Sequence, residues 1–520
     1  MSTFTKYAAA LVEGCVTTPA DIDAMRHSVN SVLASALIES KTEAPAPRRG
    51  ARAVRETQEV NAAAAGWKTS TASEMDADSG RDDATGVALD VLHTAGLECS
   101  ALPDNLNVHR VLRRVYEQRT RMVSSGDGVD WPTAEALACA TLLTDGVTVR
   151  ISGQDAERGT FSQRHAVLHE QTEVAGRTYC PLKEFAATQG RGGARFEVHN
   201  SPLSEFAVLG FELGHSLNSP SSLIVWEAQF GDFTNTAQVI LDQFICAGEA
   251  KWLVKTGIVL LVPHGMEGAG PEHSSARLER YLQLCDDDER TIPTNTSERC
   301  LRRARRTAAN MLVVNLTTPA NYFHALRRQT AHPTLRKPLV IMAPKTLLRD
   351  KRLASPLADF GPGTVFEPVL GEAESESLAP AASVRRVLFC SGRVYFDLAE
   401  AREARRAYDV AIVRVEQLSP FPYQEIREEI ARWPNAQVAW AQEEAMNYGA
   451  WSYVRPRLER TAALCGRSPR ATAAFDSGAA GGAIGTIFYI GRNPSAAPAT
   501  GLLKLHERES KELLEAAFAE

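Results

Sequence analysis

The chain has 520 residues, of which 44% are hydrophobic and 23% are charged, and its formal net charge is −6. This length supports two or three domains with separate cores, and the acidic balance argues against a nucleic-acid-binding protein. No run of about 18 uncharged apolar residues occurs, which argues against a membrane span. The nine cysteines are dispersed and form no CxxC pair, a pattern typical of reduced thiols.

The first 87 residues differ in composition from the rest of the chain. Residues 1–40 have helix-type spacing of apolar side chains and lack the apolar core of a secretory signal. Residues 41–86 are rich first in Ala, Pro and Arg and then in Ser, Asp and Gly. We therefore predict that residues 1–87 are a helical and partly disordered N-terminal segment.

Strand and helix patterns alternate from about residue 107 onward. Expected strands are 147–151, 223–226, 258–262, 311–316 and 338–342, and expected helices are 234–244 and 320–329. The second of these helices has Thr318 as its N-cap and Pro319 at its first position. This order predicts βαβ units and a parallel sheet in a domain spanning 88–350.

A second α/β unit follows a segment rich in Pro, Glu and Ser at 367–383. Its expected strands are 386–390, 410–415 and 437–440, and its expected helices are 397–407 and 422–433. We therefore predict a smaller C-terminal α/β domain over 351–520.

The most informative segment is the glycine-rich loop from His264 to Arg277. It follows the apolar run 257–262, and an open α/β sheet binds ligands at the carboxyl ends of its strands. Its glycines allow close approach of the backbone to a ligand. His264 and His273 could act as acid–base groups near neutral pH, although a loop histidine bonded to backbone would satisfy the same pattern.

Three further candidates each have a plainer structural alternative. Glu205 begins a helix in an otherwise apolar stretch, where it could serve only to stabilise the helix dipole. Glu227 follows a strand and could be a ligand group or a carboxylate at the rim. Phe233 lies beside a tight turn and could simply pack there.

Two motifs with the residue types of metal sites are incomplete. His165 and His169 would share a face only in a helix, and no third ligand is near, so a structural role is favoured. Gly126-Asp127-Gly128 could open a magnesium–diphosphate motif, but the required Asn pair is missing from residues 151–155. We interpret it as a surface turn.

Taken together, the sequence blocks resemble one family. Blocks 150–162, 226–233, 264–277 and 417–422, with the closing stretch 491–501, resemble the decarboxylating first component of the 2-oxoglutarate dehydrogenase complex. The resemblance covers about 88–520 and is weaker over 1–40. It implies a transketolase-like pyrimidine-binding domain with a parallel sheet, followed by a smaller α/β C-terminal domain.

The resemblance also implies a cofactor and a set of site residues. The family uses thiamine diphosphate, and Glu205 matches the carboxylate that hydrogen-bonds its aminopyrimidine ring. Phe233 resembles the aromatic residue that stacks on that ring, and His273 resembles the catalytic histidine near the bound substrate. The same blocks contain Gln154, Asp155, Glu227 and His264, which are further cofactor-binding candidates.

The implied activity is oxidative decarboxylation of 2-oxoglutarate in the tricarboxylic acid cycle, with succinyl transfer to a lipoyl-lysine of the dihydrolipoyl succinyltransferase component. The family is homodimeric and works in the mitochondrial matrix, or in the cytoplasm of bacteria. Its diphosphate-binding domain, which carries the magnesium ligands, has no counterpart in this sequence. Either the chain is a truncated or split gene product, which could work with a separate diphosphate-binding chain, or it has lost the activity on its own.

Two other functions remain open at this stage. The chain could be a non-catalytic assembly subunit of a 2-oxo acid dehydrogenase complex, or it could act on 2-oxoadipate. An arginine-rich segment, 299–306, fits a solvated helix and has no assigned role.

Overall fold

The computed structural model describes residues 1–42, 84–171, 176–289, 306–331, 336–372, 377–467, 481–484 and 487–519. The N-terminal helices α1 (Thr3–Glu13) and α2 (Pro19–Thr42) belong to a separate compact unit and confirm the expected helicity of residues 1–40. The predicted disorder lies almost entirely outside the described residues, as does nearly all of the arginine-rich segment. None of the described helices is long and apolar enough to cross a membrane.

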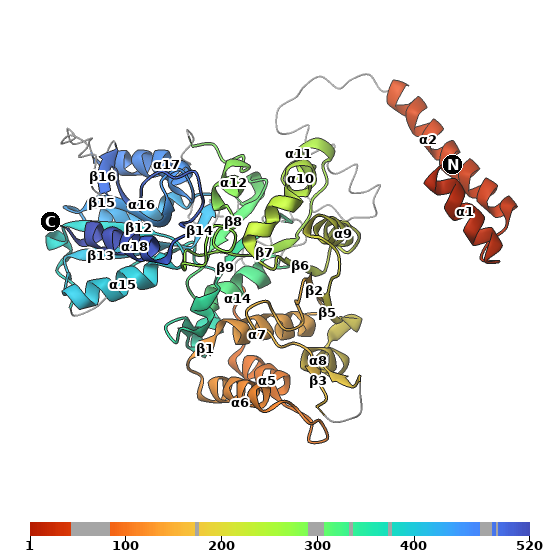
Figure 1. The fold of residues 1–520 in the computed structure, drawn as a ribbon, viewed down its shortest axis with the longest axis horizontal. Helices are drawn as coiled ribbons and strands as arrows, with labels where there is room; N and C mark the ends of the chain where they lie inside the picture. The colour runs from red at the N-terminus through yellow and green to blue at the C-terminus, as the bar shows by residue number, and fades with distance from the viewer. Residues whose placement is uncertain are drawn as a thin grey trace. The chain divides into compact units, whose positions relative to one another are not determined.

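The first sheet has seven strands, six of them parallel (Figure 1). In spatial order they are β14 (Gln417–Ser419), β8 (Leu312–Asn315), β9 (Leu339–Ala343), β7 (Val259–Pro263), β6 (Leu223–Glu227), β2 (Val149–Gly153) and β5 (Phe196–Asn200). The edge strand β14 is antiparallel to β8 and comes from the C-terminal part of the chain. The α/β fold with a parallel sheet is confirmed.

Both faces of this sheet are covered, because successive side chains of a strand point to opposite faces. Val259 and Leu261 of β7 join one apolar core, and Leu260 and Val262 join another. The first core is completed by α5 (Leu89–Ser100), α7 (Trp131–Thr144), α8 (Pro181–Gln189) and α14 (Pro319–Arg328). The second is completed by α9 (Glu205–Asn218), η3 (Leu241–Ile245) and α12 (Leu278–Gln283).

The second sheet has four parallel strands flanked by two antiparallel edge strands. In order they are β11 (Val369–Leu370), β13 (Val410–Val415), β12 (Arg386–Cys390), β15 (Gln437–Ala445), β17 (Ile487–Arg492) and β16 (Gly481–Ile484). One face packs on α15 (Val394–Arg405) and α18 (Leu503–Phe518), and the other on α16 (Tyr423–Arg432) and α17 (Trp451–Leu464).

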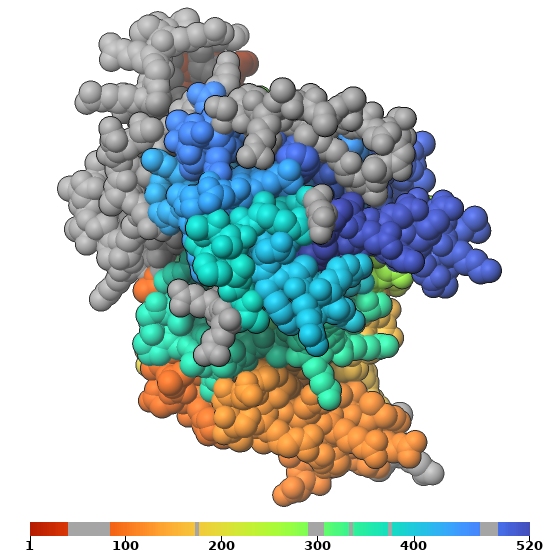
Figure 2. Space-filling model, turned by 90° about the vertical axis from the view of Figure 1, so that its left-hand side faces the viewer, coloured from red at the N-terminus to blue at the C-terminus, as the bar shows by residue number. Residues whose placement is uncertain are grey.

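The two sheets share one apolar core. Side chains of α9 and β7 belong to the same buried cluster as those of β12, β13 and α17. In Figure 2 the C-terminal residues, cyan to blue, lie directly against the teal residues that follow β9. The C-terminal domain is therefore packed against the first sheet through apolar contact, which brings its polar side chains close to the loops at the strand ends.

The remaining elements are short, except for one helix. They are α6 (Arg110–Ser125), β1 (Val129–Asp130), β3 (Leu168–His169), β4 (Thr178–Tyr179), η1 (Arg191–Gly193), η2 (Gly231–Ala237), α10 (Gln238–Ile240), α11 (Gly248–Trp252), η4 (Thr346–Arg349), β10 (Ala354–Ser355), η5 (Leu357–Phe360) and η6 (Ala381–Ser383).

The helix expected over 234–244 is irregular. Its place is taken by the 3₁₀ segment η2, one turn of α-helix in α10, and the π-helical η3. The hydroxyl of Thr234 donates to the Gly231 carbonyl at 2.7 Å, and that of Thr236 donates to the Phe233 carbonyl at 2.9 Å. These local bonds compete with regular helical bonds. The predicted cap is confirmed, because Thr318 accepts from the Asn321 N–H at 3.1 Å.

Candidate active site at the carboxyl ends of the parallel strands

The loop 264–277 joins β7 to α12 and lies at the carboxyl end of the first sheet, as predicted. The Gly265 N–H donates to the Ser274 carbonyl at 2.9 Å, and the Ser274 hydroxyl donates to the Gly270 carbonyl at 2.6 Å. Gly268 and Gly270 have φ of 74° and 86°, a conformation that favours glycine. The loop is therefore closed on itself and presents His273 near its end.

His273 packs within a group of aromatic rings. Its ring centroid lies 4.6 Å from that of Phe230 and 6.0 Å from that of Phe233, both in edge-to-face geometry. Phe161, from the loop after β2, contacts Phe230 at 5.4 Å. We call His273, Phe161, Phe230 and Phe233 the aromatic cluster. All four side chains are half-buried, so the cluster is ordered by packing and still open on one side.

The segment that supplies Phe230 and Phe233 must lie very close to the loop. A β-carbon on Gly231 would be 2.3 Å from the Pro263 carbonyl oxygen and 2.4 Å from the Ala276 β-carbon. Both distances are far below van der Waals contact, so only glycine fits here. This close approach places the aromatic rings against His273.

Two buried charged side chains hold the backbone around His273. Asp232 Oδ1 accepts from the Ser274 N–H at 3.2 Å and from the Ser275 N–H at 3.1 Å. Lys345 Nζ donates to the His273 carbonyl at 2.7 Å and to the Gly265 carbonyl at 2.8 Å. Burial lowers the pKa of Lys345.

Glu205 is the first residue of α9, and its side chain is half-buried. The helix α9 packs against η2, the segment that contains Phe233. Of the three most important sequence candidates, the structure thus brings Phe233 and His273 into ring contact and places Glu205 on a helix adjoining the same segment. The roles of Glu205 and His273 stay predictions.

Glu227 ends β6 and is buried, so it is not a carboxylate at an exposed rim. It forms an ion pair with buried Arg164, which also binds Glu135 with a shortest distance of 2.5 Å. Burial alone would raise the pKa of Glu135, but the Arg164 charge holds it below its usual value. Glu227 Oε1 is buried without a hydrogen-bond partner among the described residues, so this oxygen could accept a bond from a ligand.

His264 connects the loop to the C-terminal domain. Its Nε2 lies 2.9 Å from Glu444 Oε1 in β15, and its Nδ1 accepts from the Ala276 N–H at 3.1 Å. Burial opposes protonation of this ring, but the bond to Glu444 raises its pKa overall. Because both ring nitrogens have partners within the chain, His264 contributes to the shape of the loop whatever else it binds.

Gln154 and Asp155 lie in the loop after β2. The Gln154 side chain is exposed, and Asp155 pairs with Arg158 at 3.3 Å on the surface. The segment with His165 and His169 is not helical, since His165 has φ of 48° and His169 lies in β3, so these histidines do not share a helical face. Gly126-Asp127-Gly128 forms the turn after α6, where Gly126 has φ of 73°.

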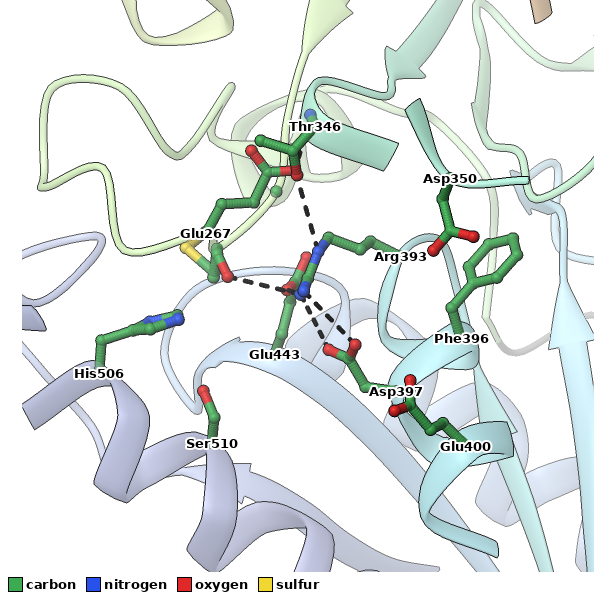
Figure 3. Close-up of polar contacts among 12 residues, drawn as sticks. Glu267, Thr346, Asp350, Arg393, Phe396, Asp397, Glu400, Glu443, His506 and Ser510 are labelled. Atoms are coloured by element: carbon green, nitrogen blue, oxygen red, sulfur yellow. Dashed lines mark hydrogen bonds and ion pairs between the residues drawn. The ribbon is translucent and has the colours of Figure 1, made fainter. Parts of the chain in front are cut away.

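Sequence reasoning missed the polar contacts that the C-terminal domain makes with this loop. Figure 3 shows Arg393 between Glu267 of the loop, Asp397 and Glu443. Its distances to the two C-terminal carboxylates are 2.9 and 3.0 Å, and its distance to Glu267 is 3.9 Å. No sequence signal marks Arg393. Lys345 could have been found, because it follows the predicted strand β9 at the ligand-binding edge.

Comparison with known proteins identifies both parts of the structure. Residues 127–351 match the family model "Transketolase, pyrimidine binding domain", and residues 354–518 match "2-oxoglutarate dehydrogenase C-terminal". The chain is 45% identical over 440 residues to mitochondrial 2-oxoglutarate dehydrogenase of Dictyostelium discoideum, covering 84% of this chain and 41% of the relative.

Two other relatives give the same picture. The mitochondrial 2-oxoglutarate dehydrogenase of Schizosaccharomyces pombe is 46% identical over 436 residues, covering 84% of this chain and 40% of the relative. The 2-oxoglutarate dehydrogenase E1 component of Brucella canis is 44% identical over 448 residues, covering 85% and 40%. The chain therefore spans about two fifths of the length of these relatives.

Proposed function

The chain belongs to the 2-oxoglutarate dehydrogenase family, and on that premise we propose that it forms part of a thiamine diphosphate-dependent active site. The reaction would be oxidative decarboxylation of 2-oxoglutarate in the tricarboxylic acid cycle, with succinyl transfer to a lipoyl-lysine of a dihydrolipoyl succinyltransferase component. The observation that supports this most is the aromatic cluster around His273, at the carboxyl ends of parallel strands in a pyrimidine-binding domain.

The site residues fit the pyrimidine end of this cofactor. The aromatic cluster offers half-buried ring surface to a planar heteroaromatic ring. Glu205 would hold a proton at a ring nitrogen, and the buried Glu227 Oε1 would accept a bond from a donor group. When bound, thiamine diphosphate supplies the electron sink that decarboxylation of a 2-oxo acid requires.

His273 would act on the substrate rather than on the cofactor. An imidazole held by aromatic contacts at a half-buried position can give a proton to a developing oxyanion or stabilise it by hydrogen bonding. The neighbouring phenylalanines would limit access of water to that position. His264, with its ring nitrogens bound by Glu444 and Ala276, would hold the loop in place instead.

The diphosphate and its magnesium ion would be bound by a domain other than the two matched here. Gly126-Asp127-Gly128 is the turn after α6, and Asp127 Oδ1 accepts from the Gly128 N–H at 2.8 Å. A diphosphate-binding domain would complete the active site. Several relatives are named as mitochondrial and others are bacterial. We propose the mitochondrial matrix for this chain if it is eukaryotic.

Reconstitution tests this function. The full chain is mixed with the separately expressed diphosphate-binding part of a 2-oxoglutarate dehydrogenase, thiamine diphosphate and magnesium, and ferricyanide reduction is followed with 2-oxoglutarate. We expect turnover that requires both proteins and is slower with 2-oxoadipate. Faster turnover with 2-oxoadipate than with 2-oxoglutarate would assign 2-oxoadipate as the substrate. Absence of turnover with either acid, while the two proteins still bind each other, would indicate an assembly subunit instead.

A further inference from the structure

Asp232 is placed unusually for an acidic residue in a short turn. Its side chain is buried, and one oxygen, Oδ1, accepts both the Ser274 and the Ser275 N–H. The other oxygen, Oδ2, is buried with no hydrogen-bond partner among the described residues. A buried carboxylate with an unpartnered oxygen is costly, so its presence calls for a compensating role. The bonds it makes lead directly to the residues that follow His273.

Lys345 approaches the same loop from another strand end. Its ammonium group is buried and donates to the carbonyl of His273 itself and to that of Gly265. It also lies 3.7 Å from Glu267, whose Oε1 accepts from the Thr346 N–H at 3.1 Å. In Figure 3, Glu267 also forms an ion pair with Arg393 of the C-terminal domain. The peptide group between His273 and Ser274 is thus bonded at its carbonyl by the Lys345 ammonium group and at its N–H by the Asp232 carboxylate.

The ring of His273 is held by the same segment that contains Asp232. Phe230 and Phe233 stand two residues before and one residue after Asp232, and both rings contact His273. One short turn therefore fixes the loop backbone through the carboxylate and the imidazole through the rings. Because Gly231 has no side chain, this turn lies close enough to the loop to make both sets of contacts.

From these contacts we propose that Asp232 and Lys345 are positioning residues for His273. They clamp the backbone at His273, Ser274 and Ser275, and thereby set where the imidazole stands against Phe230 and Phe233. Neither side chain takes part in bond making or breaking. The proposal rests on the role of His273 proposed above for its functional meaning, but the clamp itself can be measured without any turnover.

The test is the rate at which diethyl pyrocarbonate modifies each histidine of the full chain, read by peptide mass spectrometry. In Asp232→Ala we expect His273 to be modified about 10-fold faster or more, since two hydrogen bonds to a charged group are lost and the loop opens locally. Asp232→Asn keeps an amide oxygen able to accept both N–H groups and should be intermediate. Lys345→Met should act in the same direction as Asp232→Ala.

Matched controls separate positioning from general destabilisation. Asp242→Ala removes a half-buried acid that accepts from Gln238 and makes no bond to the loop among the described residues, and it should leave His273 unchanged. Within each digest, exposed His93 reports the reagent and buried His324 reports global opening. An unchanged His273 rate in Asp232→Ala, or an equal rise at His324, would overturn the proposal. In a reconstituted enzyme the same variant should lower kcat and shift its pH profile, and failure of turnover altogether would count only against the proposed function.

Discussion

At the scale of the residue, three histidines of one domain illustrate how environment decides chemistry. His273 is half-buried among aromatic rings, His264 is buried with both nitrogens bonded, and His324 is buried in α14. The bond to Glu444 raises the pKa of His264, whereas burial lowers that of His324 to about 4. Only His273 combines ordered packing with access to a ligand, which is why it is the candidate for proton transfer.

Glu205 provides the sharpest residue-level prediction. In the reconstituted enzyme we expect Glu205→Gln to lower turnover by about 10²- to 10⁴-fold, because a neutral amide cannot hold a proton at the cofactor ring as a carboxylate does. The fold should be retained, as measured by circular dichroism and thermal unfolding.

The matched control for this variant is Glu184→Gln. Glu184 is also a first-turn acid, in α8, and its side chain is exposed. If Glu205 only stabilised the helix dipole, both variants would cost about 0.3–1 kcal/mol of stability and neither would change turnover. Equal turnover in the two variants would remove Glu205 from the reaction.

His324 predicts a dependence of stability on pH. Its Nδ1 lies 2.8 Å from the Thr85 hydroxyl and its Nε2 lies 2.9 Å from the Asp359 carbonyl, so the neutral ring is satisfied. Since its pKa is about 4 in the folded state and about 6.5 when unfolded, the unfolded chain binds the extra proton first. This residue therefore reduces stability progressively as pH falls from about 6.5 to about 4.

Chemical denaturation of the wild type and of His324→Gln over this pH range measures the effect. The free energy of unfolding of the wild type should fall more steeply as pH falls than that of the variant. The difference in slope should correspond to at most one proton taken up on unfolding. Identical slopes in the two proteins would show that His324 is protonated equally in both states. The variant is expected to be less stable at pH 7, where the neutral histidine is well bonded.

At the scale of the element, the site depends on how closely neighbouring strand ends approach. Gly153 ends β2 beside Glu227 of β6, and a β-carbon there would lie 2.1 Å from the Glu227 carbonyl oxygen. The loop with Gln154 and Asp155 begins at this point. The close contact at Gly153 therefore fixes how β2 lies against β6 at the start of the loop that contains Gln154 and Asp155.

We expect Gly153→Ala to destabilise the fold by about 1–3 kcal/mol, because the strands must move apart to accept the methyl group. Gly257→Ala is the control, since a β-carbon at Gly257 would have only ordinary contacts, the nearest at 3.8 Å. Thermal unfolding of the two variants compares them. A Gly153→Ala protein as stable as Gly257→Ala would show that β2 and β6 can separate at little cost.

At the scale of the whole molecule, exposed large apolar side chains on neighbouring elements agree with the homodimer that the family resemblance implies. They lie on α9, α10, η3 and α11, and they are Phe206, Phe211, Val239, Phe244 and Trp252. The rings of Phe244 and Trp252 are in contact at 5.7 Å. Grouped large apolar side chains on a folded surface are typical of a protein–protein interface.

We expect the full chain to be a dimer by light scattering, and Phe244→Glu with Trp252→Glu to shift it to a monomer. Burial of two new charges in an apolar interface is strongly unfavourable. Val111→Glu replaces an equally exposed apolar residue on α6 and should leave the dimer intact. A dimer that persists in the double variant would place the interface elsewhere.

The sequence by itself determined the secondary-structure order and the edge of the sheet where the site lies. Parallel strands carry continuous apolar runs, so β6, β7, β12 and β13 were predictable, and a glycine-rich loop after β7 had to stand at the ligand-binding edge. The same reasoning located Phe233 and His273. It failed for residues 234–244, where Thr234 and Thr236 turn the backbone away from a regular helix through local bonds.

Only the tertiary structure decided which side chains meet across long sequence separations. His264 and Glu444, Asp232 and Ser274, and Arg393 and Glu267 come from different elements, and no local pattern encodes their pairing. Hydrophobic periodicity specifies which face of an element is buried, but not which polar group of another element it will face. The pairings of His264 and Arg393 follow from the packing of the C-terminal domain against the first sheet, whereas that of Asp232 follows from the close approach of η2 to the loop at Gly231. All three hold the loop at His273.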